Sequence, residues 1–222
     1  RENKKKIKSI VVASSDKAYG KYPIKLLPYK ENYKLNPEFP YDPSKACADI
    51  IAKSYSSKLF KLPILITRFA NIYGPGQLNF TALIPDAIRS CLLNKKFLMR
   101  SDGKAIRDFV YINDIVELYK LLSKNLYIYP KKFSGEIFNA GTNIKHEIKD
   151  IIEKIFIYKN KKKELKIILK KMYKNKTRGE ISIQFMDYKK LNLFLGWKPK
   201  YKFKQTLPEL FKWYQSYFKK NR

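Results

Sequence analysis

Apolar positions along the chain follow two patterns, short continuous runs and longer runs with helical spacing. Continuous β-branched runs are typical of strands buried in a parallel sheet, and they occur at 7–13, 63–69 and 136–141. Helical spacing predicts helices over about 42–60, 80–94, 113–124, 146–158, 188–195 and 204–219. Shorter strands are predicted around the Ser-Asp-Gly turn within 97–111 and at 165–170 and 181–185. The alternation of strands and helices predicts an α/β fold with a partly parallel sheet.

The composition narrows the class of protein. The 222 residues are 45% hydrophobic and 15% aromatic, which is enough for a sizeable core and argues against disorder. No apolar run is long enough to span a membrane. Cys47 and Cys91 lie in unrelated segments, so a disulfide framework is not predicted and a reducing, cytoplasmic compartment is favoured. His146 is the single histidine and cannot build a metal site alone, so no metal ion is predicted.

The formal net charge of +29 raises the question of a polyanionic partner. Lysines are scattered along almost the whole chain, and only residues 159–178 are dense enough to suggest a patch. A solvated charged surface is the usual explanation of such runs, so nucleic acid is not the predicted partner. A basic, non-catalytic protein that binds polyanions stays open as an alternative.

Three of the predicted strand ends carry polar residues, at 14–17, 71–76 and 139–142. In open α/β sheets, ligands bind beyond the carboxyl ends of the strands. Because parallel strands end at one edge, we expect the three segments to converge there. Ser15, Asp16 and Lys17 then lie where a substrate would bind.

The segment YDPSK, residues 41–45, supplies a second candidate group. Tyr41 and Lys45 are four residues apart and share one face of the predicted helix. Pro43 falls in the first turn, where its missing N–H would be unpaired anyway. An ammonium near a phenol favours the phenolate, and such a tyrosine can exchange a proton with a sugar hydroxyl.

Taken together, these segments resemble the extended short-chain dehydrogenase/reductase family of NAD-dependent sugar-nucleotide epimerases and dehydratases. The matching segments cover essentially the whole chain in family order: VVASSDKAYG, YDPSKACADIIAKSY, LPILITRFANIYGPG, LIPDAIRS, RSDGKAIRDFVYINDIVELY, GEISIQF and LGWKPKY. The Asp16–Lys17 pair is most similar to the CDP-glucose 4,6-dehydratase type, since related dehydratases have Asp-Glu there.

The resemblance implies roles for individual residues. The implied catalytic residues are Ser15, Asp16, Lys17, Tyr41 and Lys45. NAD would be held by Tyr41, Lys45 and Ala70, and the nucleotide-sugar by Asn71, Leu83, Arg100 and Arg107. The implied reaction is oxidation at C4, loss of water across C5/C6 and return of hydride to C6. A nucleotide-sugar 4-epimerase of the same family stays open as the alternative.

The resemblance also implies how the chain is organised. Residues 1–70 and about 112–142 would be the C-terminal part of a Rossmann-type sheet, and about 71–111 and 143–222 a small α/β substrate-binding lobe. No Gly-x-x-Gly-x-x-Gly or Gly-x-Gly-x-x-Gly occurs, so the phosphate-binding half of the Rossmann domain is expected to be absent. We therefore expect this chain alone to bind NAD poorly. A homodimer through helices that include 42–60 is also implied.

Overall fold

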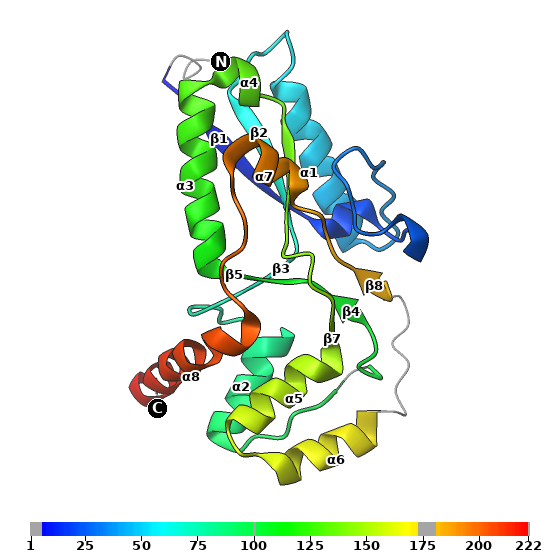
Figure 1. Cartoon of the computed structure of the whole chain (residues 1–222), viewed down its shortest axis with the longest axis vertical. Helices are drawn as coiled ribbons and strands as arrows, with labels where there is room; N and C mark the ends of the chain where they lie inside the picture. The colour runs from blue at the N-terminus through cyan, green and yellow to red at the C-terminus, as the bar shows by residue number, and fades with distance from the viewer. Residues whose placement is uncertain (1–5, 100, 173–180, 222) are drawn as a thin grey trace.

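A parallel sheet forms one half of the molecule (Figure 1). The computed structural model describes residues 6–99, 101–172 and 181–221. Strands β1 (Ile10–Ser15), β2 (Ile64–Phe69) and β6 (Ile137–Ala140) pair in the order β1-β2-β6, all parallel. All six residues of β2 are buried, as expected for a central strand. The α/β class predicted from the sequence is confirmed.

Helices cover both faces of this sheet. Successive side chains of a strand point to opposite faces, and β2 shows this directly. Ile64 and Ile66 pack in a cluster with Ala52 of α1 (Tyr41–Tyr55), whereas Leu65 packs with Leu118 of α3 (Ile112–Ile128). The sheet is therefore a middle layer between α1 and α3.

The other half is built from helices around two short sheets (Figure 1). β3 (Asn71–Tyr73) pairs in parallel with β5 (Phe109–Tyr111). β4 (Ile106–Arg107) lies between β7 (His146–Glu147), which is antiparallel to it, and β8 (Ile183–Gln184), which is parallel. The helices α2 (Leu83–Leu93), α5 (Ile148–Tyr158) and α8 (Phe203–Lys220) share one core, and α6 (Lys162–Met172) packs beside α5.

The remaining elements are short helices. They are the 3-10 helices η1 (Asp16–Tyr19) and η2 (Ile24–Leu26), and the short helices α4 (Pro130–Phe133) and α7 (Lys189–Leu195). Leu191 and Trp197 are buried in the same cluster as Leu65 and Phe138 of the sheet. The chain thus returns to the parallel sheet before α8 begins.

Some predicted elements are wrong or have different lengths. The strand predicted at 165–170 lies inside α6, because Leu165, Ile168 and Met172 are buried with the spacing of a helix. The first strand predicted within 97–111 does not form at Phe97–Met99. The helix predicted over 42–60 ends at Tyr55. A short run of basic and apolar residues fits the spacing of a strand or of a helix, so only the surface against which it packs decides between the two.

A tight turn closes η1 against the segment that follows it. Gly20 has φ +68°, in the left-handed region that favours glycine. A Cβ at Gly20 would lie 1.6 Å from the Asn36 carbonyl oxygen. Any side chain here would force the end of η1 and the backbone of Asn36 apart.

Within the described residues, no helix is both long and apolar enough to cross a membrane.

Candidate functional site

A cavity of about 480 Å³ lies at the carboxyl edge of the parallel sheet, bordered by β1, β2, α1 and the first turn of α2. It contains most of the residues that the sequence singled out: Ser15, Tyr41, Lys45, Ala70, Asn71, Leu83 and Arg107. These residues come from segments far apart in the chain, and the parallel register brings them together. Asp16 and Lys17 lie next to Ser15 but are not part of the cavity lining. Arg100 falls outside the described residues.

Tyr41 and Lys45 occupy the first two turns of α1. The Lys45 Nζ lies 5.5 Å from the centroid of the Tyr41 ring, so the two side chains share one helix face as predicted. The Tyr41 side chain is 56% exposed. Both groups are thus accessible to a ligand in the cavity.

Ser15 ends β1 and begins η1. Its Oγ donates to the Asp16 Oδ1 (3.0 Å) and accepts from the Lys17 backbone N–H (3.3 Å). This is the N-cap arrangement that satisfies a free N–H at a helix start. The capping bond accounts for a serine directly after an apolar strand, and it fixes the Ser15 hydroxyl at the cavity edge.

Asp16 is a buried carboxyl, only 3% exposed. Burial raises its pKa above the ordinary value of 3.8, while the Lys17 charge, the Ser15 hydrogen bond and the Arg107 charge oppose the shift. Its Oδ2 has no hydrogen-bond partner among the described residues. A raised pKa keeps a carboxyl protonated to a higher pH, which is the direction that a proton donor needs.

Lys17 reaches across to the second half of the molecule. Its Nζ donates to the Gln184 Oε1 at 2.6 Å, and Gln184 is fully buried in β8. β8 pairs with β4 so that Gln184 lies opposite Arg107. The amine is therefore held beside the strand that contributes Arg107 to the cavity.

Arg107 and Asn71 are fixed by backbone contacts. Arg107 is 5% exposed and its guanidinium donates to the Ile106 carbonyl at 2.8 Å. Asn71 donates its side-chain N–H to the Asp108 carbonyl at 3.1 Å. Lys45 and Arg107 place two cationic groups on one cavity, which suits an anionic ligand such as a nucleotide diphosphate.

Three further residues at this site were missed from the sequence. Asp49 of α1 and Arg68 of β2 form a buried ion pair between helix and sheet, and Gln184 accepts from Lys17. Two signals were available: Asp49 follows Lys45 by four residues, and Arg68 interrupts the apolar run ILITRF. A charge inside a buried strand indicates a buried partner. Gln184 lies in the segment GEISIQF, but nothing in the sequence linked it to Lys17.

The fold and the cavity together define a class of protein. A parallel sheet between helix layers, with Tyr-x-x-x-Lys opening a helix beside a serine at a strand end, is the arrangement of extended short-chain dehydrogenase/reductase epimerases and dehydratases. The family model of GDP-mannose 4,6 dehydratase matches residues 1–210, so the chain belongs to that family.

Individual relatives agree with this assignment. A dTDP-D-glucose 4,6-dehydratase of Dictyostelium discoideum is 36% identical over 159 residues, which is 68% of this chain and 35% of that protein. The solved dTDP-glucose 4,6-dehydratase of Bacillus anthracis, in complex with NAD, is 31% identical and has a TM-score of 0.77. The match covers 94% of this chain and 62% of the dehydratase chain.

A UDP-glucose 4-epimerase of Thermotoga maritima, solved with UDP-glucose, shares the fold with a TM-score of 0.81 at 23% identity. The match covers 95% of this chain and 64% of the epimerase. The chain thus spans less than two thirds of the length of each of these three proteins.

Proposed function

We propose that this chain carries the chemistry of an NAD-dependent nucleotide-sugar 4,6-dehydratase. The observation that supports it best is that two sets of residues meet at one sheet edge, a first set of Tyr41, Lys45 and Ser15 and a second set of Asp16 and Lys17. Tyr41 and Lys45 line the cavity with Ser15, and Asp16 and Lys17 follow Ser15 directly in η1. Oxidation at a sugar carbon needs the first set. Elimination of water also needs an acid and a base, which the second set supplies in this proposal.

The donors of the cavity fit the nicotinamide-ribose end of NAD. The Tyr41 hydroxyl and the Lys45 ammonium can bond ribose hydroxyls, and Ala70 leaves room beside them. The glycine-rich turn that lets a backbone approach the dinucleotide pyrophosphate does not occur in these 222 residues. When bound, NAD would supply the hydride acceptor at C4 and the hydride donor at C6.

In the first stage the chain removes a proton from the sugar 4-hydroxyl. Tyr41 takes that proton as C4 is oxidised. The Ser15 hydroxyl, rotated away from the Asp16 Oδ1, donates a hydrogen bond to the same sugar oxygen as it becomes a carbonyl. Lys45 would hold the nicotinamide ribose, and its positive charge would stabilise negative charge on the Tyr41 oxygen.

In the second stage the chain removes water. The 4-keto group makes the C5 proton acidic, and the Lys17 amine is proposed to take that proton. Asp16 gives its proton to the departing 6-hydroxyl, so water leaves and a C5–C6 double bond remains. The raised pKa of the buried Asp16 suits this step.

The substrate is then a nucleotide diphosphate-glucose, with Arg107 and Arg100 proposed at its pyrophosphate and base. Asn71 and Leu83 would contact the sugar nucleotide. We propose CDP-glucose among the candidates because Lys17 stands where other dehydratases have glutamate. We also propose the two-domain division at about residues 70, 112 and 142, and a homodimer through α1.

The proposal is tested with protein expressed from the whole reading frame, with the 222-residue chain in parallel. Purified protein receives NAD and dTDP-, CDP-, UDP- or GDP-glucose in deuterated water. Formation of a 4-keto-6-deoxy product with deuterium at C5 is expected. Lys17→Met should block C5 exchange while bound NADH still forms, and Tyr41→Phe should abolish both. General acid–base groups typically contribute ~10²–10⁴-fold, so each loss should be large.

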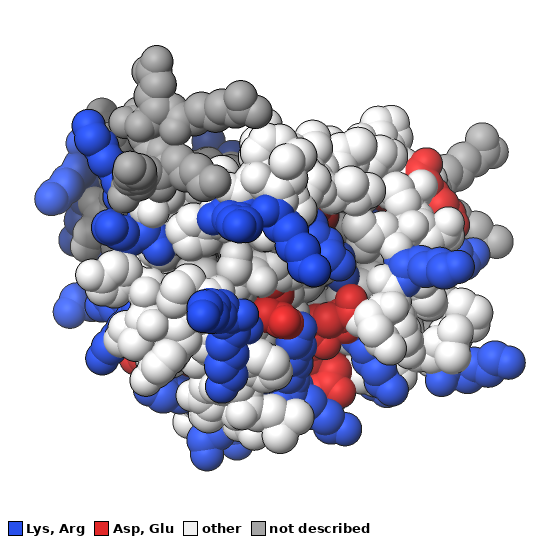
Figure 2. Space-filling view, turned by 90° about the horizontal axis from the view of Figure 1, so that it is seen from above, with Lys and Arg blue, Asp and Glu red and all other residues white. Residues whose placement is uncertain are grey.

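Other outcomes would replace the proposal. Simple interconversion of C4 epimers would establish the epimerase, which needs neither acid nor base at C5 and C6. Tight, salt-resistant binding of RNA or DNA would favour the polyanion alternative. Against that alternative, the face shown in Figure 2 has Lys and Arg spread among uncharged residues, with acidic side chains between them.

A further inference from the structure

The face of α1 that packs on the sheet is unusually small and polar. Its buried residues are Asp42, Ala46, Asp49 and Ala52. Alanine side chains give little shape complementarity, so they leave the rotation and register of a helix weakly defined. The helix that carries Tyr41 and Lys45 therefore needs a directional contact to hold one position.

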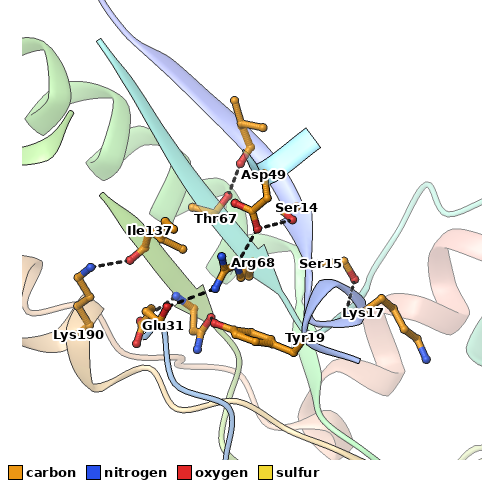
Figure 3. Close-up of polar contacts among 12 residues, drawn as sticks. Ser14, Ser15, Lys17, Tyr19, Glu31, Asp49, Thr67, Arg68, Ile137 and Lys190 are labelled. Atoms are coloured by element: carbon orange, nitrogen blue, oxygen red, sulfur yellow. Dashed lines mark hydrogen bonds and ion pairs between the residues drawn. The ribbon is translucent and has the colours of Figure 1, made fainter. Parts of the chain in front are cut away.

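Asp49 makes that contact to two strands at once. Its Oδ2 accepts from the Arg68 Nε at 2.7 Å and from the Ser14 Oγ at 3.2 Å (Figure 3). Ser14 and Arg68 are register partners on the neighbouring strands β1 and β2. One carboxylate oxygen thus ties α1 to a defined pair of positions on the sheet.

The contact between Asp49 and Arg68 is buried, and Tyr19 packs against Arg68. Asp49 is 2% exposed and Arg68 is 3% exposed. The Arg68 guanidinium lies 4.6 Å from the centroid of the Tyr19 ring, and the Tyr19 hydroxyl donates to the Asn139 Oδ1 at 2.7 Å. Arg68 therefore has a fixed location from which it can orient Asp49.

Asp49 lies on the same side of α1 as Tyr41 and Lys45, so fixing Asp49 also fixes these two residues. Asp49 follows Lys45 by four residues and Tyr41 by eight, so the three lie along one side of α1. Ser14 immediately precedes Ser15, which sits on the cavity edge. A rotation of α1 would move Tyr41 and Lys45 relative to Ser15.

We propose that Asp49 is a positioning residue, which with Arg68 and Ser14 fixes the rotation of α1 and so aligns Tyr41 and Lys45 with Ser15. The inference rests on the proposed function only in naming the reaction that would slow, which is oxidation at C4 of the sugar. Buried ion pairs often add little stability, and setting register is the best-attested reason for keeping them.

The experiment separates positioning from stability with a double variant. Asp49→Leu alone should destabilise the fold, because it leaves the Arg68 charge buried without its carboxylate. Asp49→Leu with Arg68→Met replaces the pair by apolar groups of similar size, so its urea unfolding midpoint should return close to wild type. Asp49→Asn keeps an acceptor oxygen and should lie between wild type and the double variant in activity.

Two readouts follow in the double variant. Formation of enzyme-bound NADH from a nucleotide-glucose should fall by about 10²-fold in kcat with KM little changed, as expected for misplaced groups. Amide hydrogen exchange in the first two turns of α1 should be faster, while exchange in β2 is unchanged. Glu117→Gln is the control, because it breaks the exposed Glu117–Lys200 ion pair on α3 without touching the site.

Wild-type kcat and wild-type exchange in the double variant would overturn the inference. If wild-type protein expressed from the whole reading frame forms no NADH with any nucleotide-glucose, the proposed function fails. The exchange measurement still decides whether Asp49 fixes α1.

Discussion

The Lys17 Nζ and the Gln184 Oε1 are joined by a hydrogen bond of 2.6 Å across 167 positions of sequence. Lys17 follows the last residue of β1 by two, and Gln184 is fully buried in β8. A neutral amide holds the amine in place without adding a negative charge beside it. Gln184 thus links the lysine at the sheet edge to the half of the molecule that contributes Arg107.

Removing this acceptor should affect elimination more than oxidation. In Gln184→Leu, of similar size, we expect deuterium exchange at C5 to slow about tenfold or more, while bound NADH still forms at C4. The reason is that a proton-transfer group must sit within hydrogen-bond reach of its proton. Time-resolved absorbance of NADH and mass spectrometry of the product separate the two steps. Gln215→Leu, on the exposed side of α8, is the matched control, and equal slowing of both steps would contradict the role given to Gln184.

Asp108 should make the stability of the fold depend on pH. Burial raises its pKa from 3.8 to about 6, although hydrogen bonds from Thr142 and Asn143 oppose the shift. The folded carboxyl therefore binds its proton more tightly than the unfolded one. Its contribution to the free energy of unfolding is complete below about pH 4 and is lost as the pH rises through 6.

The size of this effect can be measured by urea unfolding between pH 4 and 7. A difference of about two pKa units corresponds to roughly 3 kcal/mol, so the stability of wild type relative to Asp108→Asn should fall by about that amount over this range. Asp108→Asn should also be less stable throughout, because the N–H groups of Thr142 and Asn143 that face the carboxylate lose acceptors. Glu38→Gln, at an exposed position, should show no such trend.

The two cysteines should differ sharply in reactivity. Cys91 is buried in α2 and burial raises its pKa to about 12, whereas Cys47 on α1 is exposed. Because the thiolate is the nucleophile, iodoacetamide at pH 8 should modify Cys47 and leave Cys91 intact until urea unfolds the chain. Peptide mass spectrometry reads the sites directly. Native Cys47→Ser protein that still takes up label would show that the α2 core opens.

The outer face of α1 should govern self-association. Ile50 and Ile51 are 61% and 57% exposed there, and exposed apolar groups on one helix face are typical of an interface. Ile51→Lys should convert a homodimer to a monomer in light scattering coupled to gel filtration. Leu193→Lys is the matched control, since Leu193 on α7 is 84% exposed. Wild type that elutes as a monomer at micromolar concentration would refute the proposed dimer.

The sequence by itself determined the α/β class and selected candidate site residues, most of which line one cavity. The runs at 63–69 and 136–141 become β2 and β6 almost unchanged, because continuous apolar runs that short have few other ways to be buried. Ser15, Tyr41 and Arg107 could be selected because each lies at a strand end or a helix start with its motif intact. Local order along the chain is enough for such assignments.

Only the tertiary structure decided which of these groups meet and what holds them. The helix α6 replaces a predicted strand because its apolar residues find a partner in α5. Asp16 and Lys17 turn out of the cavity lining because the Ser15 cap starts η1. The partners Asp49–Arg68 and Lys17–Gln184 are 19 and 167 residues apart, and hydrogen bonds over such separations depend on the register of strands and the rotation of helices, which no local pattern contains.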